Sequence, residues 1–291
     1  MHRNAARKMQ HELPTHLRLF TEQAGKILNE VDSAQRDALQ ELLDKIEGSV
    51  MNHPIIACNR YLNRFAEGVT VPQARHEIQQ FSVFAIHFDI AVAKLVANAP
   101  TEEAYDERLK ILLNEKGIPF KDGFDGELTG QWSPKTVHFT WLQNMGRGLG
   151  LKFEDLGKIW IGLPGTVQFV DAVMETFNDR DQSLASGASF AIENWAANAL
   201  WAPWIAGMEK LNKSLDKKVN LGYLTYHFAE ETHHSQSTLN ELLGSFQEPW
   251  FNQEKFLQGA MTVLNNGPQA YYASQLASIP DKDESWPESA C

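Results

Sequence analysis

The amino-acid sequence predicts an all-α protein, and three observations support this prediction. Apolar residues recur at three- and four-residue steps along most of the chain, the period that places side chains on one face of an α-helix. Residues that begin or end helices separate these segments, for example Thr70-Val71-Pro72 and Asn98-Ala99-Pro100. No alternating apolar and polar pattern of useful length, which would indicate a half-buried β-strand, is present.

The helices are expected one after another, joined by short connections. A long surface loop rich in Gly, Asp and Pro is expected at residues 117–134, and a kink is expected at Asn266-Gly267-Pro268. The first helical segment, at residues 15–46, is either one amphipathic helix or two helices, the second of which begins at Asp32-Ser33. The expected helical segments are 15–46, 54–68, 70–97, 101–113, 138–145, 152–162, 164–177, 183–208, 221–243 and 253–276.

The composition is ordinary for a water-soluble globular protein of one large or two small domains. Of 291 residues, 43% are hydrophobic and 22% are charged. The net charge of −11 argues against nucleic acid or an anionic membrane as the main partner. No signal-peptide pattern is found at the N-terminus, and no apolar run is expected to cross a membrane. A small-molecule substrate is the expected partner, with a homodimer as an open option.

Two cysteines, Cys58 and Cys291, are too few for a disulfide framework or a cysteine-based metal site. We expect Cys291, the last residue, to be exposed and chemically inert. With so few cysteines and no targeting segment, the sequence favours a reducing, cytoplasmic location.

The segment 226–236 carries the strongest functional signal. It contains the pattern His227-x3-Glu231-x2-His234 inside an expected helix. At 100° per residue, Glu231 lies about 40° from His227 around the helix, and His234 lies about 20° from it on the other side. Imidazole nitrogen and carboxylate oxygen together suit iron, zinc or manganese. This face therefore predicts half of a metal site, although a solvated polar helix face would show the same pattern.

Two further helices carry candidates for the other half. Glu193 is the only acidic residue between Gln182 and Met208, in a helix rich in Ala and Trp. A lone carboxylate there is costly to bury unless it is paired or bound to a metal. In the helix at 70–97, Glu77 and His87 are candidate ligands, and His87 is flanked by apolar residues. A hydrogen-bonded core histidine is the alternative interpretation of His87.

These three helices together resemble the heme-oxygenase-like diiron oxidases and oxygenases, a family related in fold to the TenA-like thiaminases and to the chlamydial protein that associates with death domains. In that family one helix supplies a carboxylate and a His, a second supplies a Glu, and a third supplies a His-x3-Asp/Glu-x2-His run. The segment 112–117, His138 and Leu149-Gly150-Leu151 also look like the family's inter-helix region, and Leu257-Gln258-Gly259-Ala260 looks like its last helix.

The resemblance implies a heme-oxygenase-like multi-helix bundle at residues 50–279, with an N-terminal helical extension at 1–49 and an acidic tail at 280–291. It implies an enzyme, a non-heme diiron oxidase or oxygenase acting on a small amino-acid-like or fatty-acid-like substrate. Two Fe(II) ions per chain and O2 as co-substrate are implied as well. The ligand set that it implies is Glu77, His87, Glu193, His227, Glu231 and His234; no other catalytic residue is assigned.

Two positions depart from the family pattern. The third-helix acid is commonly Asp, and here it is Glu231. Some members place the first acid seven residues before the His, where this chain has Gln80, a poor ligand. The sequence therefore leaves open whether the chain binds one iron ion or two.

Three other functions fit parts of the pattern. The main alternative is a metal-free, TenA-like enzyme or binding protein with a vestigial metal site, acting on or carrying a small heterocycle. TenA-like thiaminases use a nucleophilic Cys, and Cys58 lies too near the start of the core for that role. A ferritin-like protein would need Glu-x-x-His on two helices, and this chain has it only at residues 230–234. An interaction protein with a residual site is the third option.

Overall fold

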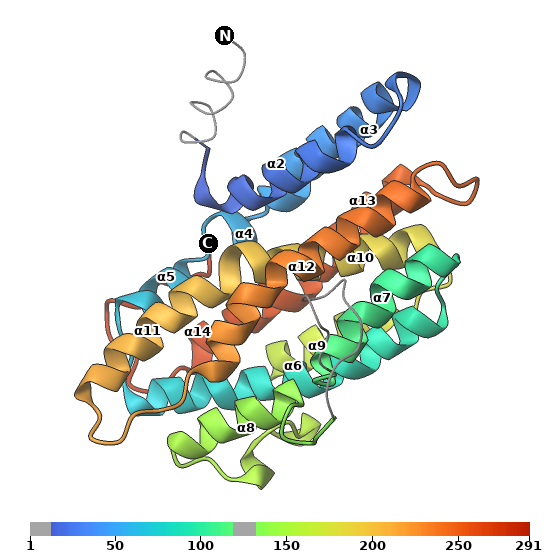
Figure 1. The fold of residues 1–291 in the computed structure, drawn as a ribbon. Helices are drawn as coiled ribbons and strands as arrows, with labels where there is room; N and C mark the ends of the chain where they lie inside the picture. Colours follow the sequence, from blue (N-terminus) through green and yellow to red (C-terminus); the bar gives the residue numbers. More distant parts are fainter. Residues whose placement is uncertain (1–12, 119–131) are drawn as a thin grey trace.

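The computed structural model describes residues 13–118 and 132–291, and this part of the chain is helical without a β-strand (Figure 1). The prediction of an all-α protein is confirmed. Most of the expected loop at 117–134, and the first twelve residues of the expected N-terminal extension, lie outside the described residues. The helices are α2 (Thr15–Leu28), α3 (Ser33–Ile46), α4 (Pro54–Ala57), α5 (Arg60–Glu67), α6 (Val71–Ala97), α7 (Glu102–Glu115), α8 (His138–Gly148), α9 (Pro164–Thr176), α10 (Gln182–Trp195), α11 (Trp201–Ser214), α12 (Gly222–Ser245), α13 (Gln253–Leu264) and α14 (Ala270–Ser278).

Short π-helical turns interrupt three of the long helical segments. They follow α3 (η1, Glu47–Met51), join α10 to α11 (η5, Ala196–Leu200) and join α13 to α14 (η6, Asn265–Gln269). The η6 turn contains Pro268, which has no backbone N–H to donate, at the predicted kink. The η5 turn begins directly after Trp195, beside the predicted ligand Glu193. Such turns in helices are frequent at functional sites.

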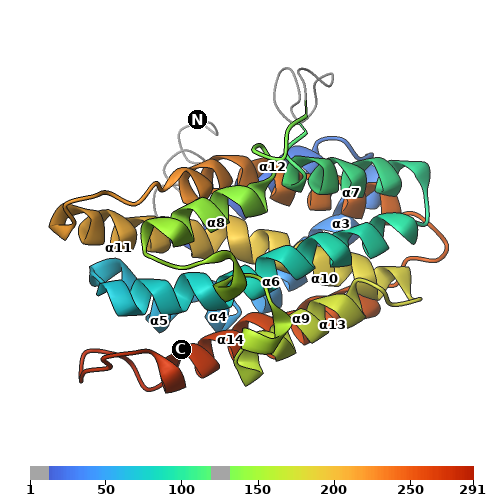
Figure 2. The ribbon, with the colours of Figure 1, turned by 90° about the horizontal axis from the view of Figure 1, so that it is seen from below.

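Helix α6 runs through the middle of the bundle, with α7 on one side of it and α9 on the other (Figure 2). Helix α12 packs against α7, α10 and α11, and α13 packs along α10. The N-terminus of α6 is capped as predicted: Thr70 and Gln73 bond to each other's backbone N–H groups. By length and composition α6 alone among the described helices is able to cross a membrane, contrary to expectation; 56% of its most apolar window is buried, as in the core helix of a globular bundle.

Helices α2 and α3 lie along one side of the bundle (Figure 1). Helix α2 is attached to α12 by the buried side chain of Gln23. Its amide nitrogen donates to the carbonyl of Thr232 at 2.9 Å, and its amide oxygen accepts from Ser235 Oγ at 3.1 Å. The predicted N-terminal extension therefore packs against the helix that carries the His-x3-Glu-x2-His pattern.

Glycine allows α10 and α13 to approach closely. A Cβ at Gly187 would overlap the carbonyl oxygen of Phe256, and a Cβ at Gly259 would overlap that of Leu184. The two backbones thus touch at reciprocal glycines, which places Glu193, nearly two turns after Gly187, at a defined depth in the core.

A buried ion pair ties α7, α10 and α12 together. Arg108 Nη2 lies 2.8 Å from Glu241 Oε1, and the two side chains are 1% and 4% exposed. Arg108 also donates to the Leu95 carbonyl at 2.7 Å and to Ser186 Oγ at 3.0 Å. Because its partners come from α6, α10 and α12, this one guanidinium sets the spacing of the helices that carry the predicted site.

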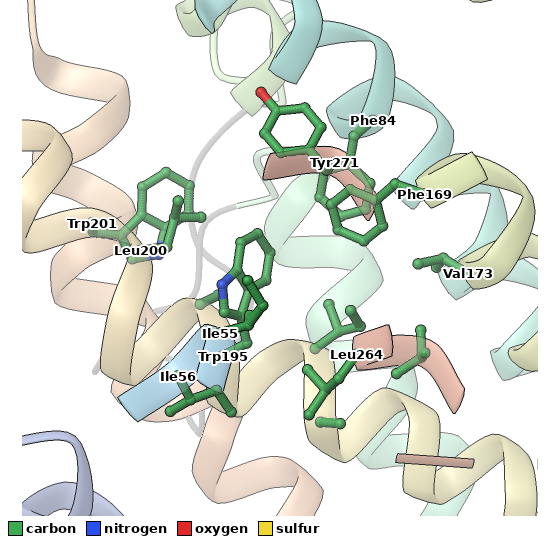
Figure 3. Packing of buried hydrophobic residues seen from close by; sticks show 14 of the residues in the cluster. Ile55, Ile56, Phe84, Phe169, Val173, Trp195, Leu200, Trp201, Leu264 and Tyr271 are labelled. Atoms are coloured by element: carbon green, nitrogen blue, oxygen red, sulfur yellow. The ribbon is translucent and has the colours of Figure 1, made fainter. Parts of the chain in front are cut away.

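Aromatic and aliphatic side chains fill the centre of the bundle (Figure 3). Phe84 of α6 stacks on Phe169 of α9 with ring centroids 3.9 Å apart, and Trp195 meets Phe169 edge to face at 5.7 Å. Phe169 also meets Tyr271 of α14, with ring centroids 5.9 Å apart, so these rings pack α14 against α9.

The C-terminal tail differs from expectation. Cys291 forms a disulfide with Cys58, so the expectation of an exposed, inert Cys291 is wrong. Within the tail, Trp286 and Ala290 are buried, and Arg60 N–H donates to the Ala290 carbonyl. Disulfides are more typical of oxidising compartments than of the cytoplasm. The cytoplasmic location therefore stays a prediction.

Candidate metal centre

A small pocket of about 40 Å³ lies in the core of the bundle, with room for a few water-sized molecules. Aromatic side chains form most of its wall, and the polar part consists of carboxylates and one imidazole. No Lys or Arg lines it among the described residues. The polar lining residues are Asp89, Glu115, Glu193, His227 and Glu231; the apolar ones are Phe81, Phe84, Ala85, Phe88, Phe139, Trp195, Ala196, Leu200, Trp201 and Tyr223.

One group of potential ligands joins α10 to α12. Glu193, Glu231 and His234 each offer one donor atom, and these atoms lie within 4.8 Å of one another. His234 Nδ1 is 3.4 Å from Glu193 Oε2 and 3.5 Å from Glu231 Oε2. All three side chains are buried. This group consists entirely of residues that the sequence predicted as ligands.

A second group joins α7, α8 and α12. Glu115, His138 and His227 likewise offer donor atoms within 4.8 Å of one another. The carboxylate of Glu115 lies between the two imidazoles: its Oε2 is 3.1 Å from His138 Nδ1, and its Oε1 is 3.6 Å from His227 Nε2. Since Glu115, His227, Glu193 and Glu231 line the same pocket, the two groups form parts of one site.

Hydrogen bonds from outside the pocket orient the imidazoles. His227 Nδ1 donates to the Tyr223 carbonyl at 2.7 Å, which leaves Nε2 facing Glu115. His234 Nε2 donates to Asn114 Oδ1 at 3.1 Å, which turns Nδ1 towards Glu193 and Glu231. Metal-binding histidines typically use one nitrogen as the ligand and the other as a donor to such a partner.

Charge in the Glu193 group is balanced within the group. Burial raises the pKa of Glu193 to about 7, although the adjacent His234 opposes this rise. Burial alone would lower the pKa of His234, but contacts with Glu193 and Glu231 raise it well above its ordinary value. These carboxylates thus hold a positive charge between them, and Glu193 and His234 titrate as a pair.

In the Glu115 group, burial alone would raise the pKa of the carboxyl, but His138 and His227 hold it well below its usual range. Burial lowers the pKa of His138, so this imidazole is neutral at pH 7. It donates through Nδ1 to Glu115, and its Nε2 lone pair faces the interior. This is the protonation state that metal coordination requires.

The donor set fits a divalent metal ion. Glu193 Oε1, Glu231 Oε2 and His138 Nε2 are buried and make no hydrogen bond to any described residue. Unsatisfied buried oxygen and nitrogen atoms are costly. A cation bound at Glu193 and Glu231 would satisfy the two oxygens, and a second cation at the other group would satisfy the His138 nitrogen. Mixed carboxylate and imidazole ligands suit iron and manganese, and also zinc.

Asp89 adds one more acid at the rim of the pocket. Its Oδ2 pairs with Lys116 Nζ at 2.6 Å, and burial raises its pKa to about 6. Lys116 follows Glu115 at the end of α7, so the pair links α6 to the end of α7.

The structure brings four of the six predicted ligands to this site. His227, Glu231 and His234 lie along one face of α12, as predicted, and Glu193 faces them from α10. Glu77 lies elsewhere, where its carboxylate accepts hydrogen bonds from Tyr61 and Tyr271. His87, half-buried on α6, bonds through Nδ1 to the Val83 carbonyl.

Two residues of the second group, Glu115 and His138, were not among the ligands predicted from the sequence. Glu115 ends α7 and His138 begins α8, so neither belongs to a repeating helical face, and the residues between them are mostly outside the described part of the chain. The signal in the sequence was that Glu115 and His138 lie in the segments that resemble the inter-helix region of the diiron oxidase family.

Gln80, which stands where some members of that family have an acid, has a structural role. It accepts hydrogen bonds from Leu163 N–H and from Thr166 Oγ1, both at 2.8 Å.

Comparison with solved structures supports a TenA-like helical fold. The structure is similar to that of a TenA homolog from Pseudomonas syringae pv. tomato, with a TM-score of 0.57 and 12% sequence identity over 82% of this chain and 93% of the other. No protein-family model and no curated protein sequence matches the chain. At this identity the likeness shows the fold alone. The chain is therefore an all-α protein of TenA-like fold with a buried carboxylate and histidine site.

Proposed function

We propose that this protein is a non-heme iron oxidase or oxygenase with a two-iron site. The observation that carries the proposal is that two separate groups, each with carboxylate and imidazole donors, face one buried pocket. Glu193, Glu231 and His234 would hold one ion. Glu115, His138 and His227 would hold the other, in place of the expected Glu77 and His87. When bound, two Fe(II) ions would supply O2 activation.

The residues of the chain would contribute binding, orientation and exclusion of water. The aromatic wall, with Phe81, Phe84 and Trp201, surrounds the pocket and favours a small substrate with an apolar body. A negatively charged head group, as in an amino acid or a fatty acid, would find no Lys or Arg among the described residues that line the pocket. Its charge would be balanced by the ions themselves.

Anaerobic titration of the metal-free chain with Fe(II) tests this proposal. We expect uptake near two ions per chain in the wild type. The variants His138→Ala and His234→Ala should each lose one ion, because each removes a ligand from a different group. His87→Ala is the matched control on α6 and should retain both. No uptake by a folded wild-type chain would refute the proposal.

The structural comparison favours one second candidate, a metal-free enzyme or binding protein of TenA-like fold. The pocket would then hold a small cationic heterocycle between aromatic rings and carboxylates. A cysteine nucleophile is not available in this role, because both cysteines are joined in a disulfide. Binding of such a heterocycle by a chain that takes up no iron would favour this candidate.

A further inference from the structure

Four oxidisable aromatic side chains connect the pocket to the C-terminal tail. Trp195 lines the pocket, and its ring centroid lies 6.3 Å from that of Tyr272. Tyr272 lies 5.2 Å from Tyr61, and Tyr61 lies 5.3 Å from Trp286. All four are at most 4% exposed. Centroid spacings in this range indicate rings in direct contact. We call Trp195, Tyr272, Tyr61 and Trp286 the aromatic path.

A buried carboxylate accompanies this path at one position. Glu77, 1% exposed, accepts a hydrogen bond from the Tyr61 hydroxyl at Oε2 and one from the Tyr271 hydroxyl at Oε1, the latter at 3.0 Å. Burying the carboxyl group of Glu77 costs free energy that an apolar side chain at this position would not cost. A carboxylate bonded to a phenol is, however, a suitable acceptor for the proton that the phenol releases when it is oxidised.

We propose that the aromatic path carries single electrons between the candidate metal centre and the protein surface, with Glu77 as the proton acceptor of Tyr61. This inference rests on the proposed function, since an oxidised iron centre is the internal oxidant. It adds a route by which the chain discharges that centre when no substrate is bound, so that the ligands are not themselves oxidised.

The transfer balances in electrons and protons. With oxidised iron bound at the candidate metal centre, one electron would leave Tyr61 and pass through Tyr272 and Trp195 to the iron, whose oxidation state would fall by one. The phenolic proton of Tyr61 passes to Glu77 Oε2 along their hydrogen bond. The pair changes from phenol and carboxylate to neutral tyrosyl radical and carboxylic acid. A one-electron reductant in solution, such as ascorbate or a thiol, then restores Tyr61 through Trp286, and Glu77 returns the proton.

The neighbours of each ring explain why the radical would rest on Tyr61. The Tyr272 hydroxyl and the Trp195 Nε1 are buried without a hydrogen-bond partner among the described residues, so neither has an acceptor for its proton. At the outer end, the Arg64 guanidinium lies 4.9 Å from the ring centroid of Trp286. That positive charge disfavours a cation radical on the indole. Tyr61 alone in the path combines ring contact on both sides with a hydrogen-bonded carboxylate.

The outer half of the path is testable in the metal-free, full-length chain. A thiol-reactive ruthenium polypyridyl photo-oxidant is attached to E284C, an exposed position two residues from Trp286. The native cysteines are paired, so the label is unique. An electron acceptor in solution oxidises the flash-excited label to ruthenium(III), which then takes one electron from the path, and the absorption and electron paramagnetic resonance of a tyrosyl radical should appear.

Three variants in this labelled chain decide the assignment. Tyr61→Phe should remove the tyrosyl signal, and Glu77→Gln, which keeps the side-chain shape but has no carboxylate to take up the proton, should slow its formation by about a hundredfold. Tyr105→Phe, at an exposed tyrosine away from the path, should change nothing. A signal that survives Tyr61→Phe, or that forms equally fast in Glu77→Gln, would overturn the proposal whatever the metal content of the protein.

The inner half is tested in the iron-loaded chain exposed to O2 without substrate. The tyrosyl signal should appear in the wild type and be lost in Tyr272→Phe, while iron uptake stays unchanged. Its persistence in Tyr272→Phe would overturn the inner half of the path. If the wild type takes up no iron while the ruthenium experiment succeeds, the proposed function fails, the link to the metal centre is overturned, and the outer electron path stands.

Discussion

His227 Nε2 faces Glu115 Oε1 at 3.6 Å, although Glu115 ends α7 and His227 lies in the second turn of α12. His234, two turns further along the same helix, faces Glu193 of α10 instead. Seven residues of α-helix span about 10 Å. The two histidines of one sequence pattern therefore point to different partners, and each belongs to a separate ligand group.

The orienting residue Asn114 should matter for metal affinity. Asn114→Ala removes the oxygen that accepts from His234 Nε2, which leaves the ring free to turn. We expect Fe(II) affinity to fall by about 10- to 100-fold at one of the two sites. Competition with a coloured chelator measures this. Asn98→Ala, at an exposed asparagine on the far end of α6, is the control and should have no effect.

Glu77 should make stability depend on pH. Burial raises its pKa from the ordinary value of 4.5 to about 7, against the hydrogen bonds from Tyr61 and Tyr271. The native state therefore binds more protons than the unfolded state above pH 4.5, and stability should fall between about pH 4.5 and 7 and then level off. The accumulated loss is about 3 kcal/mol.

Glu77→Gln should remove this part of the pH dependence, because the amide does not titrate. Urea unfolding of both chains from pH 4.5 to 8 measures the difference, and buried acids such as Glu193 contribute equally to both. If the two free-energy curves run parallel over this range, the carboxyl of Glu77 is not buried as the structure describes.

The buried pair Arg108–Glu241 should be needed for assembly of the helices around the site. Arg108→Ala leaves Glu241 buried without its cation and should cost about 3–5 kcal/mol of unfolding free energy. Lys45→Ala, which removes an exposed pair with Glu41, should cost less than about 1 kcal/mol. Chemical denaturation compares the two, and a similar small loss in both would contradict this assignment.

Close helix packing at Gly187 should not tolerate a methyl group. Gly187→Ala would overlap the Phe256 carbonyl oxygen and should destabilise the protein by about 1–3 kcal/mol. Gly25→Ala is the matched control in helix α2, where nothing lies near the added Cβ. It should stabilise by about 0.5–1 kcal/mol, since Ala favours a helix interior over Gly. Thermal unfolding distinguishes the opposite signs.

The disulfide should hold the C-terminal tail against α5. Reduction, or Cys58→Ser, frees the end of the chain next to Trp286, which is buried against Tyr61. We expect tryptophan emission to shift to longer wavelength and proteolysis to begin within residues 280–291. Trp286→Phe should remove the emission change but not the cleavage. A tail that resists proteolysis after reduction would show that packing alone holds it.

The sequence by itself determined the all-α fold, the capped start of α6, the proline break at η6 and the face of α12 that carries His227, Glu231 and His234. These features depend on helical periodicity and on capping residues within a few positions of each other, so they can be read locally. Glu193 was also predicted, because a lone acid in an apolar helix needs a partner.

Only the tertiary structure decided which residues meet. Helical period placed Glu77 and His87 on a buried helix, but packing turned Glu77 towards Tyr61 and Tyr271, while Asp89 of the same helix reached the pocket. Glu115 and His138 sit at helix ends, where the path of the chain, and not a repeating face, sets their direction. Contacts between helices that are distant in sequence depend on how whole helix surfaces pack. Local sequence patterns do not predict these contacts.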